Sequence, residues 1–208
     1  MQFVKTLLDL VFPPRCEVCR TMETDGLCEN CEKKITLLKP SAFIHSVGAY
    51  EGPLKTAILR FKFKKKLNLA EPLGALMVKY LSRSLDVNNI DFLVPVPLHL
   101  KRLKQRGFNQ SELLAHIVTK YYDIPTVSGL LFRVKDTHPQ FNLPRTERFK
   151  NVRGAFEVKG TPFLKGKSVL LIDDIYTTGS TISECTRVLR ENGANNVHVL
   201  TLSRAFTM

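Results

Sequence analysis

Residues 168–182 read SVLLIDDIYTTGSTI and carry the strongest indication of the fold class. Val169–Ile172 is a continuous aliphatic run, which is typical of a strand buried on both faces of a parallel sheet. The run ends at two adjacent acids, Asp173 and Asp174, and a turn of small residues, Thr177–Thr181, follows them. A buried strand, an acidic pair and a glycine-containing turn in this order predict an α/β domain with a ligand site at the carboxyl end of the strand.

An amphipathic helix is predicted over residues 181–192, directly after the turn. Thr181 and Glu184 have the spacing of a capping box at its start, and Asn192 followed by Gly193 is a typical helix end. Cys185 falls on the apolar face of this helix, where we expect a buried and inert thiol.

The turn has the chemistry of a phosphate site. Amide groups at a turn and at a helix start, together with threonine and serine hydroxyls, can surround a phosphate monoester without a lysine. Gly179 permits a backbone conformation that other residues rarely adopt. The two carboxylates lie where they can accept hydrogen bonds from the hydroxyls of the sugar that carries the phosphate. The candidate ligand residues are Asp173, Asp174, Thr177, Thr178, Gly179, Ser180 and Thr181.

The string VLLIDDIYTTGST, residues 169–181, resembles the 5-phosphoribosyl-1-pyrophosphate (PRPP) signature of type I phosphoribosyltransferases in nearly every position. The resemblance implies a PRPP site in which bound Mg²⁺ bridges pyrophosphate and ribose oxygens. An ordinary strand-to-helix turn is the alternative. It accounts for Thr181 and Gly179 but leaves the two adjacent acids unexplained.

Residues 92–110 read FLVPVPLHLKRLKQRGFNQ and hold a second cluster of candidate site residues. Phe92–Val96 has the character of a core strand, and a helix is predicted over 110–121, capped by Asn109 with Glu112. The loop between them is dense in cations, as expected where a pyrophosphate is held, and a solvated basic loop is the alternative. The candidate pyrophosphate residues are Lys101, Arg102 and Arg106, with Arg102 and Arg106 assigned a catalytic role beside Asp173 and Asp174.

Four of the five cysteines form the pattern Cys16-x2-Cys19-x8-Cys28-x2-Cys31. Two thiolate pairs at this spacing suit a tetrahedral zinc site, and four sulfur ligands leave no open position, so we expect a structural metal. Two disulfides are the alternative, which a reducing compartment disfavours. Residues from about 14 to 40 are therefore expected to form a zinc ribbon whose folding depends on the metal.

Positive charge is concentrated in the centre of the chain. Of the formal net charge of +12, residues 51–110 contribute 8, with 12 Lys and Arg against 4 Asp and Glu. Such a region indicates a polyanionic partner, although a solvated basic surface has the same composition. In residues 60–66, RFKFKKK, cations alternate with phenylalanines as in single-strand binders, and Phe61 and Phe63 are equally compatible with a helix core. The candidate nucleic-acid residues are Arg60, Lys62, Lys64, Lys65 and Lys66.

Residues 135–156, KDTHPQFNLPRTERFKNVRGAF, show no convincing periodicity. An ordered stretch of this length without regular structure is uncommon unless it works as a lid or a binding loop. We expect it to close over the ligand, with Arg148 contributing charge there, and a plain surface loop is the alternative.

Several longer strings resemble the ComF (ComFC) family of bacterial competence proteins, which includes GntX-like relatives. They are LVFPPRCEVC, PVPLHLKRLKQRGFNQ, HPQFNLPRTERFKNVRGAF and IDDIYTTGST. The resemblance implies a zinc-binding segment with structural Zn²⁺ at the four cysteines, fused to a phosphoribosyltransferase-type domain that binds PRPP with Mg²⁺. It also implies a role in handling single-stranded DNA during natural transformation, with competence proteins such as a DNA-uptake helicase as partners.

The expected fold is α/β, a phosphoribosyltransferase-type, mostly parallel twisted sheet flanked by helices, with a small N-terminal zinc-binding module. We expect a short helix and the four-cysteine zinc ribbon in residues 1–40, and the phosphoribosyltransferase-type domain in residues 41–208, with a hood segment at 41–65. The expected strands lie near 92–97, 130–134, 168–173 and 197–203, the expected helices lie near 69–84, 110–121 and 181–192, and a strand and helix in 42–63 are expected to form the hood.

No apolar run reaches the roughly 18 residues that span a bilayer, and the N-terminus lacks the features of a signal peptide. We therefore expect a soluble, cytoplasmic protein without a transmembrane segment. Residues 1–12 place apolar side chains on one face of a short helix, which is expected to pack on the protein's own core. A peripheral contact with the inner face of the membrane is the alternative.

Two functions stay open at the level of sequence. In the first, the protein binds PRPP and acts on single-stranded DNA during uptake. In the second, it transfers ribose 5-phosphate from PRPP to a base or amine in nucleotide salvage. The candidate residues favour PRPP binding in both cases but specify no acceptor, so enzymatic activity is undecided.

Overall fold

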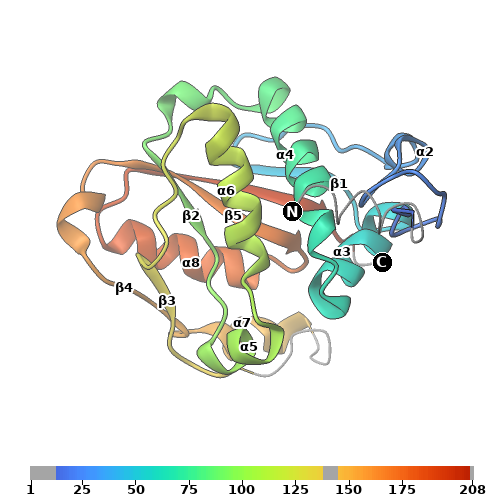
Figure 1. Ribbon diagram of the computed structural model, residues 1–208. Helices are drawn as coiled ribbons and strands as arrows, with labels where there is room; N and C mark the ends of the chain where they lie inside the picture. The colour runs from blue at the N-terminus through green and yellow to red at the C-terminus, as the bar shows by residue number, and fades with distance from the viewer. Residues whose placement is uncertain (1–12, 138–144, 207–208) are drawn as a thin grey trace, which may run out of the picture.

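The computed structural model describes residues 13–137 and 145–206 (Figure 1). In chain order its helices and strands are α2 (Glu29–Lys33), β1 (Ile44–Ala49), α3 (Gly52–Lys64), α4 (Ala70–Ser84), β2 (Phe92–Pro95), α5 (Leu100–Arg106), α6 (Gln110–Tyr122), β3 (Leu131–Arg133), α7 (Arg145–Val152), β4 (Phe156–Val158), β5 (Ser168–Tyr176), α8 (Ser180–Glu191) and β6 (Asn196–Arg204). Short 3₁₀ turns lie at Leu67–Leu69, Val87–Asn89 and Thr161–Leu164.

A four-stranded sheet forms the centre of the molecule, in the order β1-β6-β5-β2, and all neighbouring pairs are parallel. Strand β5 is internal, with Ile172 opposite Pro95 of β2 on one side and opposite Leu200 of β6 on the other. Its aliphatic run is fully buried because alternate side chains enter two separate cores. The prediction of a mostly parallel sheet centred on this strand is confirmed.

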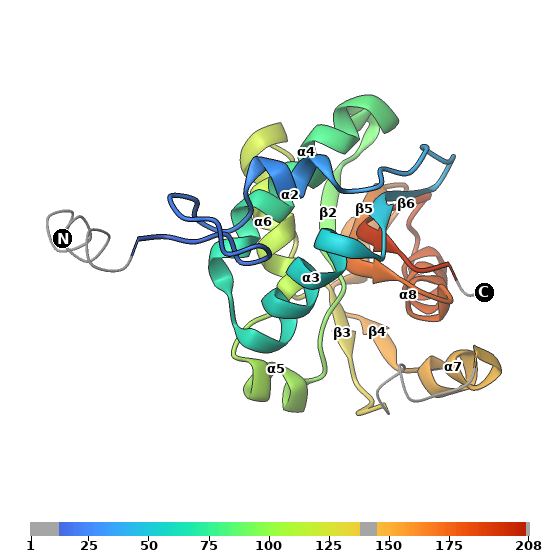
Figure 2. The same cartoon turned by 90° about the vertical axis from the view of Figure 1, so that its right-hand side faces the viewer.

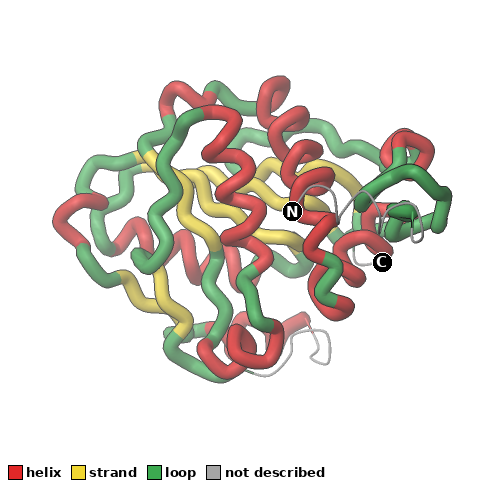
Figure 3. The backbone as a smooth tube through the Cα atoms, viewed as in Figure 1, coloured by secondary structure: helices red, strands yellow, loops and turns green. Residues whose placement is uncertain are grey.

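Helices cover both faces of the sheet (Figures 1 and 2). Helices α4 and α6 pack on one face, where Met77, Leu81 and Leu114 are fully buried with Leu170 and Ile172 of β5. Helix α8 packs on the other face in a core that contains Cys185, the buried thiol expected from the sequence. Figure 3 shows the helices arranged around the strands, and the three predicted helices are found within about one residue of their expected limits.

The predicted position of residues 130–134 in the main sheet is wrong. Strand β3 pairs antiparallel with β4 in a separate two-stranded sheet, with Leu131 opposite Val158. The backbone groups of β2 with which such a strand would pair already have hydrogen-bond partners. The Leu93 N–H donates to the Pro125 carbonyl, and the Leu93 carbonyl accepts from the Val127 N–H. A strand edge that is already hydrogen-bonded offers no second ladder.

The strand predicted for the hood belongs to the main sheet. Strand β1 pairs parallel with β6, with Ile44 opposite Val199, and its inward side chains such as Val47 are buried in the core shared with α4. Helix α3, the other part of the predicted hood, packs into the same core through Leu54, Ile58 and Phe61, which are fully buried, and its end lies beside the N-terminal module (Figure 2).

Residues 145–152 form helix α7, so the prediction of an irregular stretch over 135–156 is wrong for this segment. The helix is strongly charged. Among its residues with a described side chain, Val152 at the end of the helix is the one that is buried. Such a helix gives no apolar periodicity to detect, and it is held by packing against α8. Residues 138–144 of the predicted lid lie outside the described residues, as do residues 1–12 of the predicted N-terminal helix.

Candidate functional site

The two adjacent acids lie at the carboxyl end of β5, which is the end of a parallel sheet where ligands bind. Both are buried, with Asp173 8% and Asp174 3% exposed. The Asp173 Oδ1 atom accepts hydrogen bonds from Ser111 Oγ (3.0 Å) and from the Asp174 backbone N–H (2.9 Å). Asn109 is the N-cap of α6, as predicted, and therefore fixes the helix that delivers Ser111.

Burial raises the pKa of Asp173 to about 7, and the negative charge of Asp174 adds to this effect. The Lys62 ammonium, the Asp174 backbone N–H and the Ser111 hydroxyl act in the opposite direction. A carboxyl group whose pKa lies near neutrality holds a proton in a substantial fraction of molecules at physiological pH.

Asp174 has a resident cation. The Lys62 Nζ atom lies 3.0 Å from Asp174 Oδ1 and 2.9 Å from Oδ2, and the two side chains are 17% and 4% exposed. From the sequence, Lys62 is a candidate nucleic-acid residue. The structure places its ammonium group against Asp174 in the cleft, and the nucleic-acid role stays a prediction. The spacing of Lys55, Leu59 and Lys62, four and then three residues apart, puts all three on one face of α3 and is the signal that identifies them.

The turn after β5 has the backbone conformation expected of a phosphate loop. Gly179 has a φ of +79°, which strains any other residue, and a Cβ atom built there would clash with the Tyr176 hydroxyl, so a larger residue would also require Tyr176 to move. Helix α8 starts at the next residue, Ser180, whose hydroxyl is 3.1 Å from that of Thr178. The start of a helix leaves amide groups without an intrahelical acceptor, which is the arrangement that binds anions.

The predicted capping box of α8 is wrong. The N-cap is Gly179, which precedes the expected helix start at residue 181, and it makes no side-chain cap. The Glu184 carboxylate instead accepts from the Gly154 backbone N–H (2.6 Å) and pairs with Arg187 (2.7 Å). Glu184 therefore ties the segment after α7 to α8 and does not cap the start of the helix.

The basic segment after β2 is the short helix α5 rather than a loop. Arg102 donates to the Thr137 carbonyl (2.5 Å), and Arg106 donates to the Gln110 side chain and lies 5.5 Å above the Phe63 ring. Lys101 is 68% exposed and pairs with Asp136 (3.3 Å). Arg102 and Arg106 thus face the site, whereas Lys101 lies outside it.

These groups line one cleft of about 870 Å³. Asp173, Asp174, Thr177 and Thr181 are on its wall, and so is Arg148 of α7, whose role in a lid stays a prediction. Seven cationic side chains face two carboxylates, which favours a polyanionic ligand. The cationic lining residues are Lys55, Lys62, Lys65, Arg102, Arg106, Arg133 and Arg148. Arg133 was missed because its three-residue strand carries no motif, and Lys55 because it lies outside the basic run.

The remaining cations of residues 60–66 do not form a single exposed stripe. Arg60 and Lys66 pair with Glu17 of the N-terminal module, at 3.9 and 3.0 Å. Phe61 is fully buried, whereas Phe63 is 60% exposed. Lys64 and Lys65 are exposed, and Lys65 also borders the cleft.

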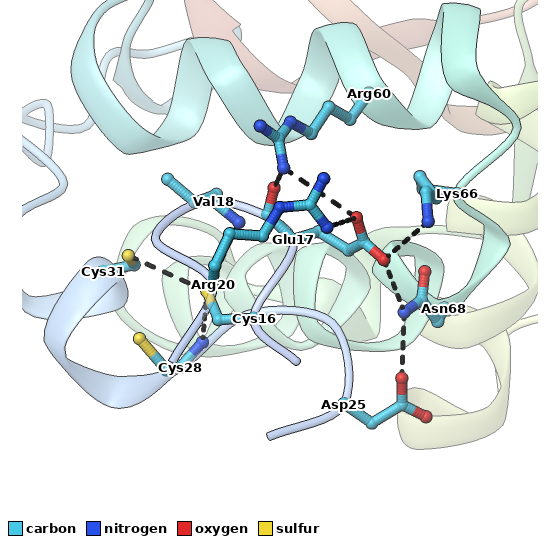
Figure 4. A network of polar contacts seen from close by, with 10 residues as sticks. All are labelled: Cys16, Glu17, Val18, Arg20, Asp25, Cys28, Cys31, Arg60, Lys66 and Asn68. Carbon is cyan, nitrogen blue, oxygen red and sulfur yellow. Dashed lines mark hydrogen bonds and ion pairs between the residues drawn. The ribbon is translucent and has the colours of Figure 1, made fainter. Parts of the chain in front are cut away.

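The four cysteine Sγ atoms lie within 4.8 Å of one another. Cys16 and Cys31 are 3.9 Å apart and Cys19 and Cys28 are 3.5 Å apart, close to the roughly 3.8 Å edge of a tetrahedron with Zn–S bonds of about 2.3 Å. The backbone N–H groups of Val18 and Cys28 point at Cys16 Sγ, each at 3.4 Å, as suits a metal-bound thiolate (Figure 4). These residues fit a structural zinc ion.

Two family models match the chain. Residues 7–42 match the double zinc ribbon domain, and residues 74–205, more than half of the chain, match the phosphoribosyl transferase domain. Strand β1 and helix α3 fall between the two matched ranges, so the division into 1–40 and 41–208 stays a prediction.

Curated relatives match over most of the chain. Competence protein F of Haemophilus influenzae is 29% identical over 92% of this chain and 97% of its own. DNA utilization protein YhgH of Escherichia coli K12 is 32% identical over 91% of this chain and 89% of its own. Competence protein ComFC of Bacillus subtilis is 32% identical over 91% of this chain and 78% of its own.

Similar solved structures include two proteins whose names refer to phosphoribosyl groups. One is glutamine PRPP amidotransferase from B. subtilis, with a TM-score of 0.42 and 23% identity over 64% of this chain and 25% of that longer chain. The other is adenine phosphoribosyltransferase from Leishmania donovani, with a TM-score of 0.45 and 11% identity over 82% of this chain and 86% of that chain. On the family models and the curated relatives, the chain belongs to the ComF (ComFC) family of competence proteins, and it carries an N-terminal double zinc ribbon and a phosphoribosyltransferase domain.

Proposed function

We propose that this protein binds PRPP with Mg²⁺ in the cleft and acts on single-stranded DNA during natural transformation. The observation that carries the proposal is the convergence on one cleft of the buried acid pair, the glycine turn at the start of α8 and the arginines of α5. The names of the curated relatives, which refer to competence and DNA utilization, support the DNA role.

Each part of PRPP has a matching group in the cleft. The 5-phosphate is assigned to the turn Thr177–Thr181, where backbone amides and hydroxyls can donate. The ribose hydroxyls are assigned to the carboxylates of Asp173 and Asp174, which accept hydrogen bonds. The pyrophosphate is assigned to Arg102 and Arg106 of α5, with Arg148 of α7 on the same wall.

The carboxylate oxygens of Asp173 and Asp174 are suitable ligands for Mg²⁺, as in sites that bind nucleotides. Carboxylate oxygens are hard ligands, and Mg²⁺ is commonly held by one or two carboxylates together with substrate phosphates. When bound, the ion neutralises charge on the pyrophosphate. Lys62 already offsets the negative charge of Asp174, so the protein itself supplies part of the positive charge that the acid pair needs.

Single-stranded DNA is assigned to the exposed rim of the cleft near the end of α3, where Phe63, Lys64 and Lys65 are exposed. Replacing Lys64 and Lys65 with Ser is expected to weaken binding of a labelled single strand at low salt. Because each phosphate contact on a single strand contributes about 0.7 to the slope of log affinity against log salt, the slope should fall by roughly 1–2.

Fluorescence anisotropy across a salt series measures this effect. The matched control replaces the exposed Lys33, Lys34 and Lys39 of the N-terminal module with Ser, which should leave the slope unchanged. If the unmodified protein shows no affinity for single strands even at low salt, the DNA assignment is wrong.

We also place the protein in the cytoplasm, at or near the inner face of the membrane, with other competence proteins such as a DNA-uptake helicase as partners. None of the helices in residues 13–137 and 145–206 has the length and apolar character needed to cross a bilayer.

Phosphoribosyl transfer to a base or amine is the second candidate function. It is favoured by the size of the cleft, because about 870 Å³ leaves room beside PRPP for an acceptor. Transfer predicts PRPP consumption and pyrophosphate release with at least one acceptor in a panel of bases and amines, and Asp173→Asn should abolish that release. Absence of turnover with every acceptor would count against transfer but leave PRPP binding intact.

A further inference from the structure

Glu17 of the zinc module has its carboxylate buried, with the side chain only 7% exposed, and it is surrounded by donors (Figure 4). The Lys66 Nζ atom lies 3.0 Å from Oε1, Arg60 Nη1 lies 3.9 Å from Oε2, and Asn68 Nδ2 donates to Oε1 at 3.4 Å. Arg60 also donates to the Glu17 backbone carbonyl. Arg20, from the module itself, lies 3.6 Å from Oε2. Glu17 is therefore a point of attachment between the zinc module and the end of α3.

Two of these partners flank Lys62 and Phe63, which are two of the four residues that α3 contributes to the cleft. Arg60 lies in the last turns of the helix and Lys66 follows its end, while Lys62 and Phe63 lie between them in the chain. Lys62 points to the opposite side from Arg60 and pairs with Asp174. Phe63 lies beneath the guanidinium group of Arg106. The same short segment is thus held by the zinc module on one side and reaches the acid pair on the other.

The charge of this segment makes an anchor necessary. Residues 60–66 contain five cations, and like charges four residues apart, such as Arg60 with Lys64, destabilise a helix. Among the described residues, the carboxylates that pair with this segment are those of Glu17 and Asp174. The buried Phe61 ties this part of α3 to the core, but the residues after it have no buried side chain in the helix, and helix ends fray when nothing holds them. Without Glu17, Asp174 is the remaining described carboxylate that offsets the repulsion.

We infer that Glu17 is a positioning residue, through which the zinc module holds the end of α3 so that Lys62 neutralises Asp174 and Phe63 supports Arg106. In this way the zinc module sets the affinity of the cleft for sugar phosphates. The inference rests on the proposed binding of a phosphoribosyl group in the cleft. It goes beyond that proposal because it gives the zinc module a role in ligand binding, although none of the module's described residues lines the cleft.

The test is a calorimetric titration of the zinc-loaded protein with ribose 5-phosphate. Glu17→Gln should weaken binding by roughly 5- to 30-fold, the upper part of the roughly 2- to 30-fold range typical of residues that act on a site without touching the ligand. Zinc content should stay unchanged, because Glu17 is not a ligand. Arg20→Gln is the matched control, because Arg20 pairs with the same carboxylate but belongs to the module and is 58% exposed. The affinity of this variant for ribose 5-phosphate should stay within about twofold of that of the unmodified protein.

A double-mutant cycle with Lys62→Gln separates positioning from general destabilisation. Lys62→Gln should itself weaken binding, and adding Glu17→Gln should then cause a smaller loss than it does in the unmodified protein, because the route through Lys62 and Asp174 is already gone and only the support of Arg106 by Phe63 is left to lose. If the losses multiply instead, Glu17 does not act through Lys62 and the inference is overturned. Equal affinity of Glu17→Gln and the unmodified protein overturns it as well.

Two further outcomes are distinguishable. If Glu17→Gln does not fold, the double variant Arg60→Gln/Lys66→Gln removes the same pairs from the side of α3, and it should show the same loss of affinity with zinc retained. Unchanged affinity of that variant contradicts the inference. If the unmodified protein binds no ribose 5-phosphate, the proposed function fails first, and the inference falls with it.

Discussion

Asp173→Asn is expected to weaken PRPP binding at least roughly 100-fold and, at the same time, to raise the free energy of unfolding at pH 8 by roughly 2–4 kcal/mol. The binding loss follows because an amide is a weaker acceptor for ribose hydroxyls than a carboxylate. The gain in stability follows because Asp173 is buried beside a second acid, which raises its pKa to about 7. A residue kept for ligand binding at the expense of stability is common in functional sites.

The stability gain has a defined pH range. The folded-state pKa of Asp173, about 7, lies above the ordinary value of 3.8, so the ionised form is disfavoured by folding. The unmodified protein therefore loses stability as the pH rises from about 4 to about 7, at about 1.36 kcal/mol for each unit of pKa difference. Asn carries no charge and does not follow this change. The advantage of the variant should be absent near pH 4 and complete above pH 7.

Urea unfolding at pH 4, 6 and 8 measures this difference. Asp123→Asn is the matched control, because Asp123 is exposed at the end of α6 with a φ of +56°, a conformation that Asn also tolerates. That variant should show no pH-dependent gain. A lower stability of Asp173→Asn at pH 8 would contradict the assignment of a buried, destabilising carboxylate at this position.

Removal of zinc, or Cys28→Ser, is expected to lower the melting temperature by roughly 10–20 °C. Structural zinc sites contribute many kcal/mol to folding, and a loss of about 5 kcal/mol shifts the melting temperature of a domain of this size by that amount. Three of the four ligands, Cys16, Cys28 and Cys31, are buried in the core that also contains residues of α3 and α4. Loss of the metal should therefore destabilise the main domain as well as the module.

Differential scanning calorimetry combined with zinc analysis tests this expectation. Cys185→Ala is the matched control, because that thiol is buried against the opposite face of the sheet and has no part in the cluster. It should retain its zinc and lose only a few degrees. Burial raises the pKa of the Cys31 thiol, so zinc binding displaces protons and should weaken as the pH falls. A Cys28→Ser variant with unchanged zinc content and melting temperature would contradict the metal assignment.

The central strand, its turn and its helix were predictable because several local signals agree there. The aliphatic run of β5, the acid pair and the glycine turn each specify the same strand-to-helix unit, and the burial of Asp173 and Asp174 follows from their position at the strand end. The cysteine pattern was likewise sufficient, since ligand spacing alone fixes which sulfur atoms can meet.

The failures have a common cause, which is that partners distant in the chain decide the outcome. The spacing of Thr181 and Glu184 fits a capping box, but Gly154, 30 residues earlier, takes the carboxylate. Residues 130–134 have strand character, but the edge of β2 is occupied by the segment around Thr126. The pairing of Lys62 with Asp174, 112 residues later, was likewise not predictable from the basic run, because it depends on the packing of α3.

The most direct measurement is an isothermal titration of the zinc-loaded protein with PRPP in the presence of Mg²⁺. Saturable binding of PRPP, with a dissociation constant below about 100 μM and loss of the signal in Asp173→Asn, is the predicted result. The absence of any binding at millimolar PRPP, in a protein shown to be folded and to hold zinc, would contradict the assignment of a phosphoribosyl site to this cleft.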